Sequence, residues 1–243
     1  VSDAPFARRA RRQRKVTPME TLRRGFGLLE GPVWDPQLGI LFADAQHGGV
    51  HRLDQHGVVT TIVEHRRGIG GMVRHEGGGV VVSGRNVGYK GPLASGTVVL
   101  LDNDRANGVV GFNDITTDRL GRIYAGALGF LPTESELSGI GGEGRSAPLY
   151  LVDLDGSSRC VHPDIKLSNG MGFSPDGRLL YHADSGDRTV YVYDVHDNGD
   201  LSDRRPLVSV VEGLPDGLAI DVDGSIWLAV AHAGQVLVYS AKG

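Results

Sequence analysis

The feature that most constrains this chain is a pattern that recurs five times along it. Each copy places a key residue before a short apolar step, a turn that contains Asp or Gly, and a second strand-like run. The key positions are Glu30, Gly71, Asn113, Asn169 and Asp216, which are separated by 41, 42, 56 and 47 residues. A repeat of this length, with several short strands per unit, is typical of the blades of a β-propeller.

The spacing inside the repeats is also nearly constant. Asn113, Asn169 and Asp216 each precede the glycine of the following turn by eight residues, and Glu30 precedes its glycine by nine. Between two strand-like runs, the sequence Pro-Asp-Gly at 175–177 predicts a hairpin turn, because Pro presets φ and Gly tolerates positive φ. We therefore predict an all-β fold in which the key residues lie where the innermost strand of each blade begins.

Length and charge limit the remaining possibilities. The chain has 243 residues, a size at which one all-β domain is ordinary, and we predict a single propeller over residues 16–243 after a basic, disordered tail at 1–15. A net charge of −4 argues against nucleic-acid binding, and no apolar run is long enough for a membrane helix. Cys160 is the single cysteine, which excludes an intrachain disulfide, and we expect a cytoplasmic protein.

Two segments depart from the regular repeat. The polar, glycine-rich stretch Gly129–Pro148 lengthens the third unit and predicts a surface loop, either a lid over the channel or a plain insertion. The run Gln235–Gly243 is the third strand of the fifth unit, so the fifth blade lacks its outer strand. Open sheet edges are normally covered, and we expect that a further blade of about 45 residues is missing.

Four of the key residues carry oxygen donors in the same register. Equivalent positions in a propeller converge on the central channel, so Glu30, Asn113, Asn169 and Asp216 are expected to meet there. Two carboxylates and two amides suit a hard cation such as Ca²⁺, whereas no His or Cys occupies this register for a typical zinc site. The alternative is that each residue only caps a turn.

The motifs EGPVW, FNDITTDRLGRIYAG, SNGMGFSPDGRLLYHADS and PDGLAIDVDGSIWLA resemble the senescence-marker-protein/gluconolactonase/luciferin-regenerating family. The resemblance covers about residues 29–243 and implies a six-bladed propeller with one divalent metal ion, Ca²⁺ first and Mn²⁺, Zn²⁺ or Mg²⁺ as alternatives. It implies that the metal ligands are Glu30, Asn113, Asn169 and Asp216, and that Asp216 also serves as the general base. Members that hydrolyse sugar lactones often carry Arg two residues before the first ligand Asn, where this chain has Gly111.

The resemblance leads us to expect a metal-dependent lactonase that acts on a small molecule and binds neither nucleic acid nor membrane. The metal would polarise the lactone carbonyl and activate a water molecule; the sequence leaves open whether Asp216 or a metal-bound hydroxide is the base. Two alternatives remain, a metal-dependent phosphotriesterase of the same fold and a non-catalytic calcium-binding scaffold.

Other polar and aromatic residues were assigned by their position in the repeats. Arg85, Asn86 and His232 are candidates for substrate binding at the mouth of the channel. His182 is expected to be a structural histidine, and Asp184 and Ser185 are expected to hydrogen bond a neighbouring blade. Trp34 and Trp227 are expected in the core between blades.

Overall fold

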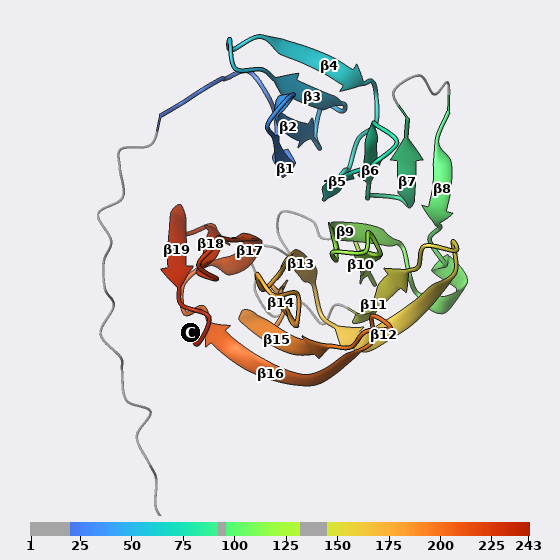
Figure 1. Cartoon of the computed structure of the whole chain (residues 1–243), viewed down its shortest axis with the longest axis vertical. Helices are drawn as coiled ribbons and strands as arrows, with labels where there is room; N and C mark the ends of the chain where they lie inside the picture. Colours follow the sequence, from blue (N-terminus) through green and yellow to red (C-terminus); the bar gives the residue numbers. More distant parts are fainter. Residues whose placement is uncertain (1–19, 92–95, 132–144) are drawn as a thin grey trace, which may run out of the picture.

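The computed structural model describes residues 20–91, 96–131 and 145–243, and these form five antiparallel sheets arranged as blades around a ring (Figure 1). Blade 1 contains β1 (Leu29–Asp35), β2 (Gly39–Asp44), β3 (Val50–Leu53) and β4 (Val59–Val63). Blade 2 contains β5 (Met72–Arg74), β6 (Val80–Val82), β7 (Val87–Lys90) and β8 (Val98–Leu101). A short 3₁₀ helix, Arg105–Asn107, follows β8.

The remaining three blades repeat this arrangement. Blade 3 contains β9 (Gly111–Thr117), β10 (Ile123–Leu128), β11 (Ala147–Val152) and β12 (Ser158–Ile165). Blade 4 contains β13 (Ser168–Phe173), β14 (Leu179–Asp184), β15 (Thr189–Val195) and β16 (Leu201–Ser209). Blade 5 contains β17 (Leu214–Ile220), β18 (Ile226–Ala231) and β19 (Gln235–Tyr239). The predicted all-β propeller is thus confirmed, with five blades in the described part of the chain.

The turn after the inner strand is built in the same way in blades 3, 4 and 5. Gly177 has φ 75° and donates its backbone N–H to Ser174 O at 2.8 Å, which closes the turn predicted at 175–177. Gly121 and Gly224 repeat this geometry, with φ 90° and 80° and N–H groups bonded to Asp118 O and Asp221 O. Glycine occupies these positions because a side chain disfavours the left-handed conformation. The constant spacing in the sequence therefore reflects one repeated hairpin.

The hydrophobic core lies between the blades and has no single centre. Each blade meets the next through alternate residues of its strands, so four clusters of buried side chains alternate with the five sheets. Their largest fully buried members are Tyr124, Tyr181, Tyr193 and Phe112. The first strand of each blade is innermost, and neighbouring inner strands pack in the order β1, β5, β9, β13, β17. This order carries the start of every repeat toward the axis of the ring.

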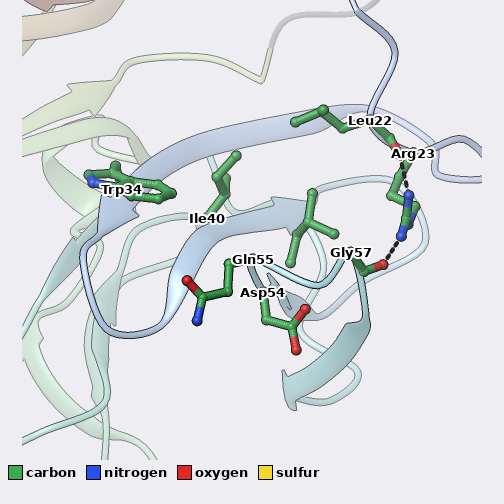
Figure 2. Close-up of a pocket in the computed structure, with 8 residues that line it drawn as sticks. Leu22, Arg23, Trp34, Ile40, Asp54, Gln55 and Gly57 are labelled. Carbon is green, nitrogen blue, oxygen red and sulfur yellow. Dashed lines mark hydrogen bonds between the residues drawn. The ribbon is translucent and has the colours of Figure 1, made fainter.

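Among the described residues, neither tryptophan is buried between two blades, contrary to the expectation. Trp34 and Trp227 are 68% and 39% exposed, on the faces of blades 1 and 5 opposite those that pack against blades 2 and 4. On the blade 1 face, Trp34 stands beside Ile40 in the pairing of β1 with β2. Figure 2 shows the pocket of about 250 Å³ on this face, which is lined by Leu22, Arg23, Trp34, Ile40, Leu53, Asp54, Gln55 and Gly57.

Two predicted segments fall partly or wholly outside the described residues. The basic tail at 1–15 lies outside them, as does 132–144 in the insertion. The insertion also ends earlier than expected, because Ala147 and Pro148 already belong to β11. Among the described residues, no helix is long and apolar enough to cross a membrane.

Candidate metal centre

Each inner strand that carries a candidate ligand contains a β-bulge at that point. In blade 3, Phe112 and Ile115 pair with Ala127 and Ala125, so Asn113 and Asp114 together oppose a single residue of β10. The same two-to-one arrangement places Asn169 with Gly170 in β13 and Asp216 with Gly217 in β17. A bulge bends its strand and redirects its side chains. The repeated bulge therefore aims equivalent side chains at the axis of the ring.

Blade 1 differs by one residue. Its bulge lies between Glu30, which pairs with Ala43, and Val33, which pairs with Leu41. The extra residues are Gly31 and Pro32, so Glu30 comes one position before the bulge, which accounts for its spacing of nine instead of eight. The side chain of Glu is one methylene longer than that of Asp.

The two candidate amides are held by hydrogen bonds from their nitrogen atoms. Asn113 Nδ2 donates to the carbonyl oxygen of Ser168 at 2.9 Å, and Asn169 Nδ2 donates to Ser185 Oγ at 3.2 Å. Asn169 also donates to the carboxylate of Asp216. Because the nitrogen of Asn113 is bound to blade 4, the carbonyl oxygen of the same amide group is left as an acceptor.

The carboxylates of the site influence one another strongly. Burial and then the charges of Asp216 and Asp114 raise the pKa of Glu30 to about 8. Burial also raises the pKa of Asp216, against the opposing effects of hydrogen bonds from Asn169 and the Gly217 N–H and of the charge of His232. Like charges in a poorly hydrated site disfavour ionisation. The structure thus brings Glu30, Asp216 and Asn169 together, with Asn113 on the adjacent strand.

The sequence analysis missed Asp114, which follows Asn113 in the bulge of β9. Burial and the charge of Asp216 raise its pKa to about 7. Blade 2 makes room for it with Gly71, where a Cβ would lie 2.8 Å from Asp114 Oδ1 and 2.6 Å from the backbone nitrogen of Ile115. The adjacent Asn-Asp pair was the only available signal, and it was passed over because Asp114 lies outside the repeated register.

The described residues contain no group of three or more His, Cys, Asp and Glu side chains arranged to hold a metal ion. The candidate set of Glu30, Asn113, Asn169 and Asp216 has two carboxylates and completes its donors with amide oxygens. Carbonyl and carboxylate oxygens are the donors of Ca²⁺ and Mg²⁺ sites, whereas Zn²⁺ and Cu²⁺ favour nitrogen and sulfur.

The three candidate substrate residues have different surroundings. Arg85 is exposed in the loop after β6, and its guanidinium makes no hydrogen bond or ion pair within the described ranges. Its Cα would lie 3.8 Å from a Cβ placed on Gly111. Asn86 has a structural contact instead, since its Oδ1 accepts a hydrogen bond from Arg66 Nη2 at 2.9 Å. His232 is exposed, has φ 64°, and acts electrostatically on Asp216.

Asp184 is the last residue of β14 and Ser185 follows it, and Ser185 has the structural role that was expected. Its hydroxyl donates to the carbonyl oxygen of Pro215 and so joins blade 4 to blade 5 beside Asp216. Asp184 instead accepts hydrogen bonds from the backbone N–H groups of Lys166 and Leu167, at 3.1 and 3.0 Å. These two residues form the segment that leads from β12 into β13, the first strand of the blade that contains Asp184. Asp44 binds the N–H of Gly27 in the same way in blade 1.

Comparison with known proteins finds relatives that are lactonases. The chain is 31% identical over 223 residues to the pentonolactonase XacC of Haloferax volcanii, an alignment that covers 88% of this chain and 70% of that protein. It is 31% identical over 232 residues to the 6-deoxy-6-sulfogluconolactonase of Pseudomonas putida, with 88% and 72% covered.

Comparison of structures supports the fold. The calcium-binding protein regucalcin of Agrobacterium tumefaciens superposes with a TM-score of 0.75 over 91% of this chain and 74% of that chain, at 20% sequence identity. Residues 28–243 match the family described as SMP-30/gluconolactonase/LRE-like region. The chain belongs to the SMP-30/gluconolactonase/LRE-like family.

Proposed function

We propose that this protein is a divalent-metal-dependent hydrolase that opens the ring of a lactone. The observation that carries the proposal is the repeated bulge, which turns Asn113, Asn169 and Asp216 toward one axis and leaves Glu30 beside it. Membership of the family and the two lactonases at 31% identity support this reaction class. A sugar lactone is the substrate class that these relatives favour.

The residues present fit a divalent cation such as Ca²⁺. Burial, and then repulsion from Asp216 and Asp114, raises the pKa of Glu30, and a cation between Glu30 and Asp216 would offset the repulsion between these two carboxylates. The nitrogen atoms of Asn113 and Asn169 are bound to Ser168 and Ser185, which leaves their carbonyl oxygens as donors. We assign these four side chains as the metal ligands. When bound, the metal ion supplies Lewis acidity toward the lactone carbonyl.

Asp216 is the residue that we assign as base or water-orienting group. Its carboxylate is held by hydrogen bonds from Asn169 and from the N–H of Gly217, so its direction is set before substrate arrives. A carboxylate in this position can orient a water molecule and accept its proton as the water attacks the carbonyl carbon. Opening of the ring then leaves a hydroxy acid.

We propose that Arg85 and His232 contact the substrate from opposite blades. Arg85 extends from the loop of blade 2 next to Gly111, and it can donate hydrogen bonds to the hydroxyl or anionic groups of a lactone. His232 lies in the loop of blade 5, near Asp216. Asn86 lies in the same loop as Arg85 and contributes indirectly. Its side-chain oxygen accepts a hydrogen bond from Arg66 Nη2 at 2.9 Å, which ties this loop to the segment between β4 and β5.

Hydrolysis of a panel of lactones, followed in a pH-stat, tests the reaction. The protein is treated with EDTA and then given Ca²⁺, Mn²⁺, Zn²⁺ or Mg²⁺, and turnover should return with at least one ion. Asn169→Ala should lose both metal binding, measured by calorimetry, and turnover. Asn198→Ala, in the turn between β15 and β16, is the matched control. Metal binding without turnover on any lactone would contradict the proposed reaction, and organophosphates would then test the phosphotriesterase alternative.

We also propose that the functional propeller has six blades. Neighbouring blades elsewhere cover one another's apolar faces, whereas Trp34 on blade 1 and Val236 on blade 5 are 68% and 55% exposed. The alignments also cover only 70% and 72% of the two lactonases. The chain has two tryptophans, Trp34 and Trp227, one on each of these faces. Acrylamide should quench neither in protein isolated from its native cells; efficient quenching of both would contradict a sixth blade.

A further inference from the structure

One position of the second strand of each blade has an unusual occupant in blade 4. The residue that pairs across the sheet with the first regular residue after each inner-strand bulge is Leu41 in blade 1, Ala125 in blade 3 and Leu228 in blade 5. Blade 2 has Val82 at the corresponding pair. Blade 4 has His182, which pairs with Met171 and is fully buried. A fully buried imidazole in an otherwise apolar register needs a specific reason.

His182 is connected to the candidate metal centre by two hydrogen bonds. Its Nε2 lies 2.8 Å from Ser168 Oγ, and the carbonyl oxygen of Ser168 accepts the bond from Asn113 Nδ2 at 2.9 Å. Ser168 is also the residue directly before Asn169. Gly126 leaves the space for this contact, because a Cβ there would collide with the Ser168 hydroxyl. His182 therefore fixes the residue that joins the two candidate amide ligands.

The other side of the imidazole faces further polar groups. His182 Nδ1, the Tyr193 hydroxyl and Arg204 Nε are buried, and none has a hydrogen-bond partner among the described residues. The rings of His182 and Tyr193 are 6.3 Å apart between centroids, and Arg204 acts electrostatically on both. Each of these three buried atoms forgoes a hydrogen bond that water would provide.

The hydrogen-bond count indicates what these three atoms bind. Ser168 Oγ has no other partner in the described part of the chain, so its O–H donates to Nε2 and the proton of the neutral imidazole sits on Nδ1. One water molecule placed among them would accept from His182 Nδ1 and Arg204 Nε and donate to the Tyr193 oxygen, which would give the three bonds that a buried water usually makes. An anion fits less well, because Arg204 already lies 3.4 and 3.5 Å from the carboxylates of Asp184 and Asp187.

We propose that His182 is a positioning residue that orients the Asn113 amide through Ser168, and that an internal water molecule held by Tyr193 and Arg204 completes its hydrogen bonds. The orienting role rests on the proposed metal centre. The water site does not, since it depends only on the contacts within blade 4.

Metal affinity tests the positioning role. Calorimetry with Ca²⁺ should show a loss of about tenfold or more in affinity for folded His182→Phe, which cannot bond to Ser168. His182→Gln should restore most of the affinity, because its side-chain carbonyl oxygen can accept the Ser168 O–H in the place of Nε2. Equal affinity in wild type and His182→Phe would overturn the role. A wild type that binds no metal at all would instead refute the proposed function.

A double-mutant cycle tests the water site without any metal. His182→Phe and Tyr193→Phe should shift the denaturation midpoint by amounts that do not add, because either change breaks the same water bridge. Tyr124→Phe is the matched control, since the Tyr124 hydroxyl donates directly to Gly199 O at 2.8 Å and its loss should add to that of His182. Additive shifts for His182 and Tyr193 would overturn the bridge.

The tautomer of His182 gives a test that needs no variant. Long-range ¹H–¹⁵N correlation spectra of the wild-type protein should show the His182 proton on Nδ1. A proton on Nε2 would overturn the hydrogen-bond count on which the water site rests.

Discussion

All five blades begin with a hairpin, but the inner strand of blade 2 differs from the other four in the residues that it places near the axis of the ring. The inner strands β1, β9, β13 and β17 are bulged and present Glu30, Asn113, Asn169 and Asp216. The inner strand β5 pairs with β6 without a register shift, and Gly70 and Gly71 precede it.

This difference indicates that the glycines before the inner strand of blade 2 leave room for neighbouring side chains, whereas the inner strands of the other blades carry the candidate metal ligands. A Cβ on Gly70 would collide with Asn113 Oδ1, and one on Gly71 would lie 2.8 Å from Asp114 Oδ1. The backbone of blade 2 therefore approaches blade 3 closely enough to support its polar bulge. Blade 2 has its own polar residue, Arg85, but in a loop instead of the inner strand.

The largest effect is expected when the carboxylate of Asp216 is removed from the bulged strand β17. Asp216→Asn keeps the size of the side chain but removes its charge and its capacity to accept a proton. We expect kcat to fall by about 10²–10⁴-fold, the usual contribution of a general base. Stopped assays on the preferred lactone measure it. A variant with wild-type kcat would show that Asp216 is neither base nor water-orienting group.

A second test fills the space that blade 2 provides. Gly71→Ala should lower the free energy of unfolding by about 1–3 kcal/mol, because its Cβ meets backbone at 2.6 Å and cannot be accommodated without a shift. Gly96→Ala is the control, since nothing lies within 4 Å of a Cβ there. Urea denaturation measures both. Equal stability of the two variants would contradict the supporting role of blade 2.

A third test concerns His182 in blade 4, where blade 2 has Val82. Burial, and then the charges of Arg204 and His162, lower the pKa of His182 to about 3. The unfolded chain takes up a proton near pH 6.5 and the folded chain does not, so stability is complete above pH 6.5 and is lost as the pH falls toward 3. At pH 5 the loss is about 2 kcal/mol.

The difference in unfolding free energy between wild type and His182→Phe isolates this contribution from that of the carboxylates. The difference should shrink between pH 6.5 and pH 5, since only the wild type is destabilised by protonation of the histidine. A difference that is constant with pH would show that His182 titrates normally in the folded protein.

The smallest effect is expected at the loop of blade 2. Arg85→Ala should raise KM by about 10-fold and leave kcat unchanged, which is the effect of losing one charge-assisted hydrogen bond to bound substrate. Arg105→Ala, in the 3₁₀ helix after β8, is a matched exposed control. An unchanged KM in Arg85→Ala would leave blade 2 with a purely spatial role.

Much of the architecture followed from local pattern. The turn at 175–177 and the start of β9, β13 and β17 were predictable because Pro, Asp and Gly report backbone conformation directly. The bulges were not predicted, since two residues opposite one is a property of the paired strands. Asp114 was missed for the same reason: its interactions with Glu30 and Asp216 and the close approach of Gly71 from blade 2 depend on how the blades pack.

The two tryptophans show a second limit of prediction from the sequence. Trp34 follows Val33 and Trp227 lies between Ile226 and Leu228, in strands whose two faces are both apolar at that point, and nothing local distinguishes a covered sheet face from an exposed one. The sequence likewise predicts only a structural role for His182 and does not indicate its contact with Ser168.

The sequence by itself determined that the chain is all-β, that it is built from repeated hairpins, and where the oxygen-bearing residues stand in each repeat. These properties depend on short-range conformational preferences and on the two-residue period of a strand. Only the tertiary structure decided which faces are covered, how the bulges turn Asn113, Asn169 and Asp216 toward one axis, and that His182 lies behind Ser168. Those contacts join residues on different strands, and the energy of packing strand on strand and one blade on the next selects them.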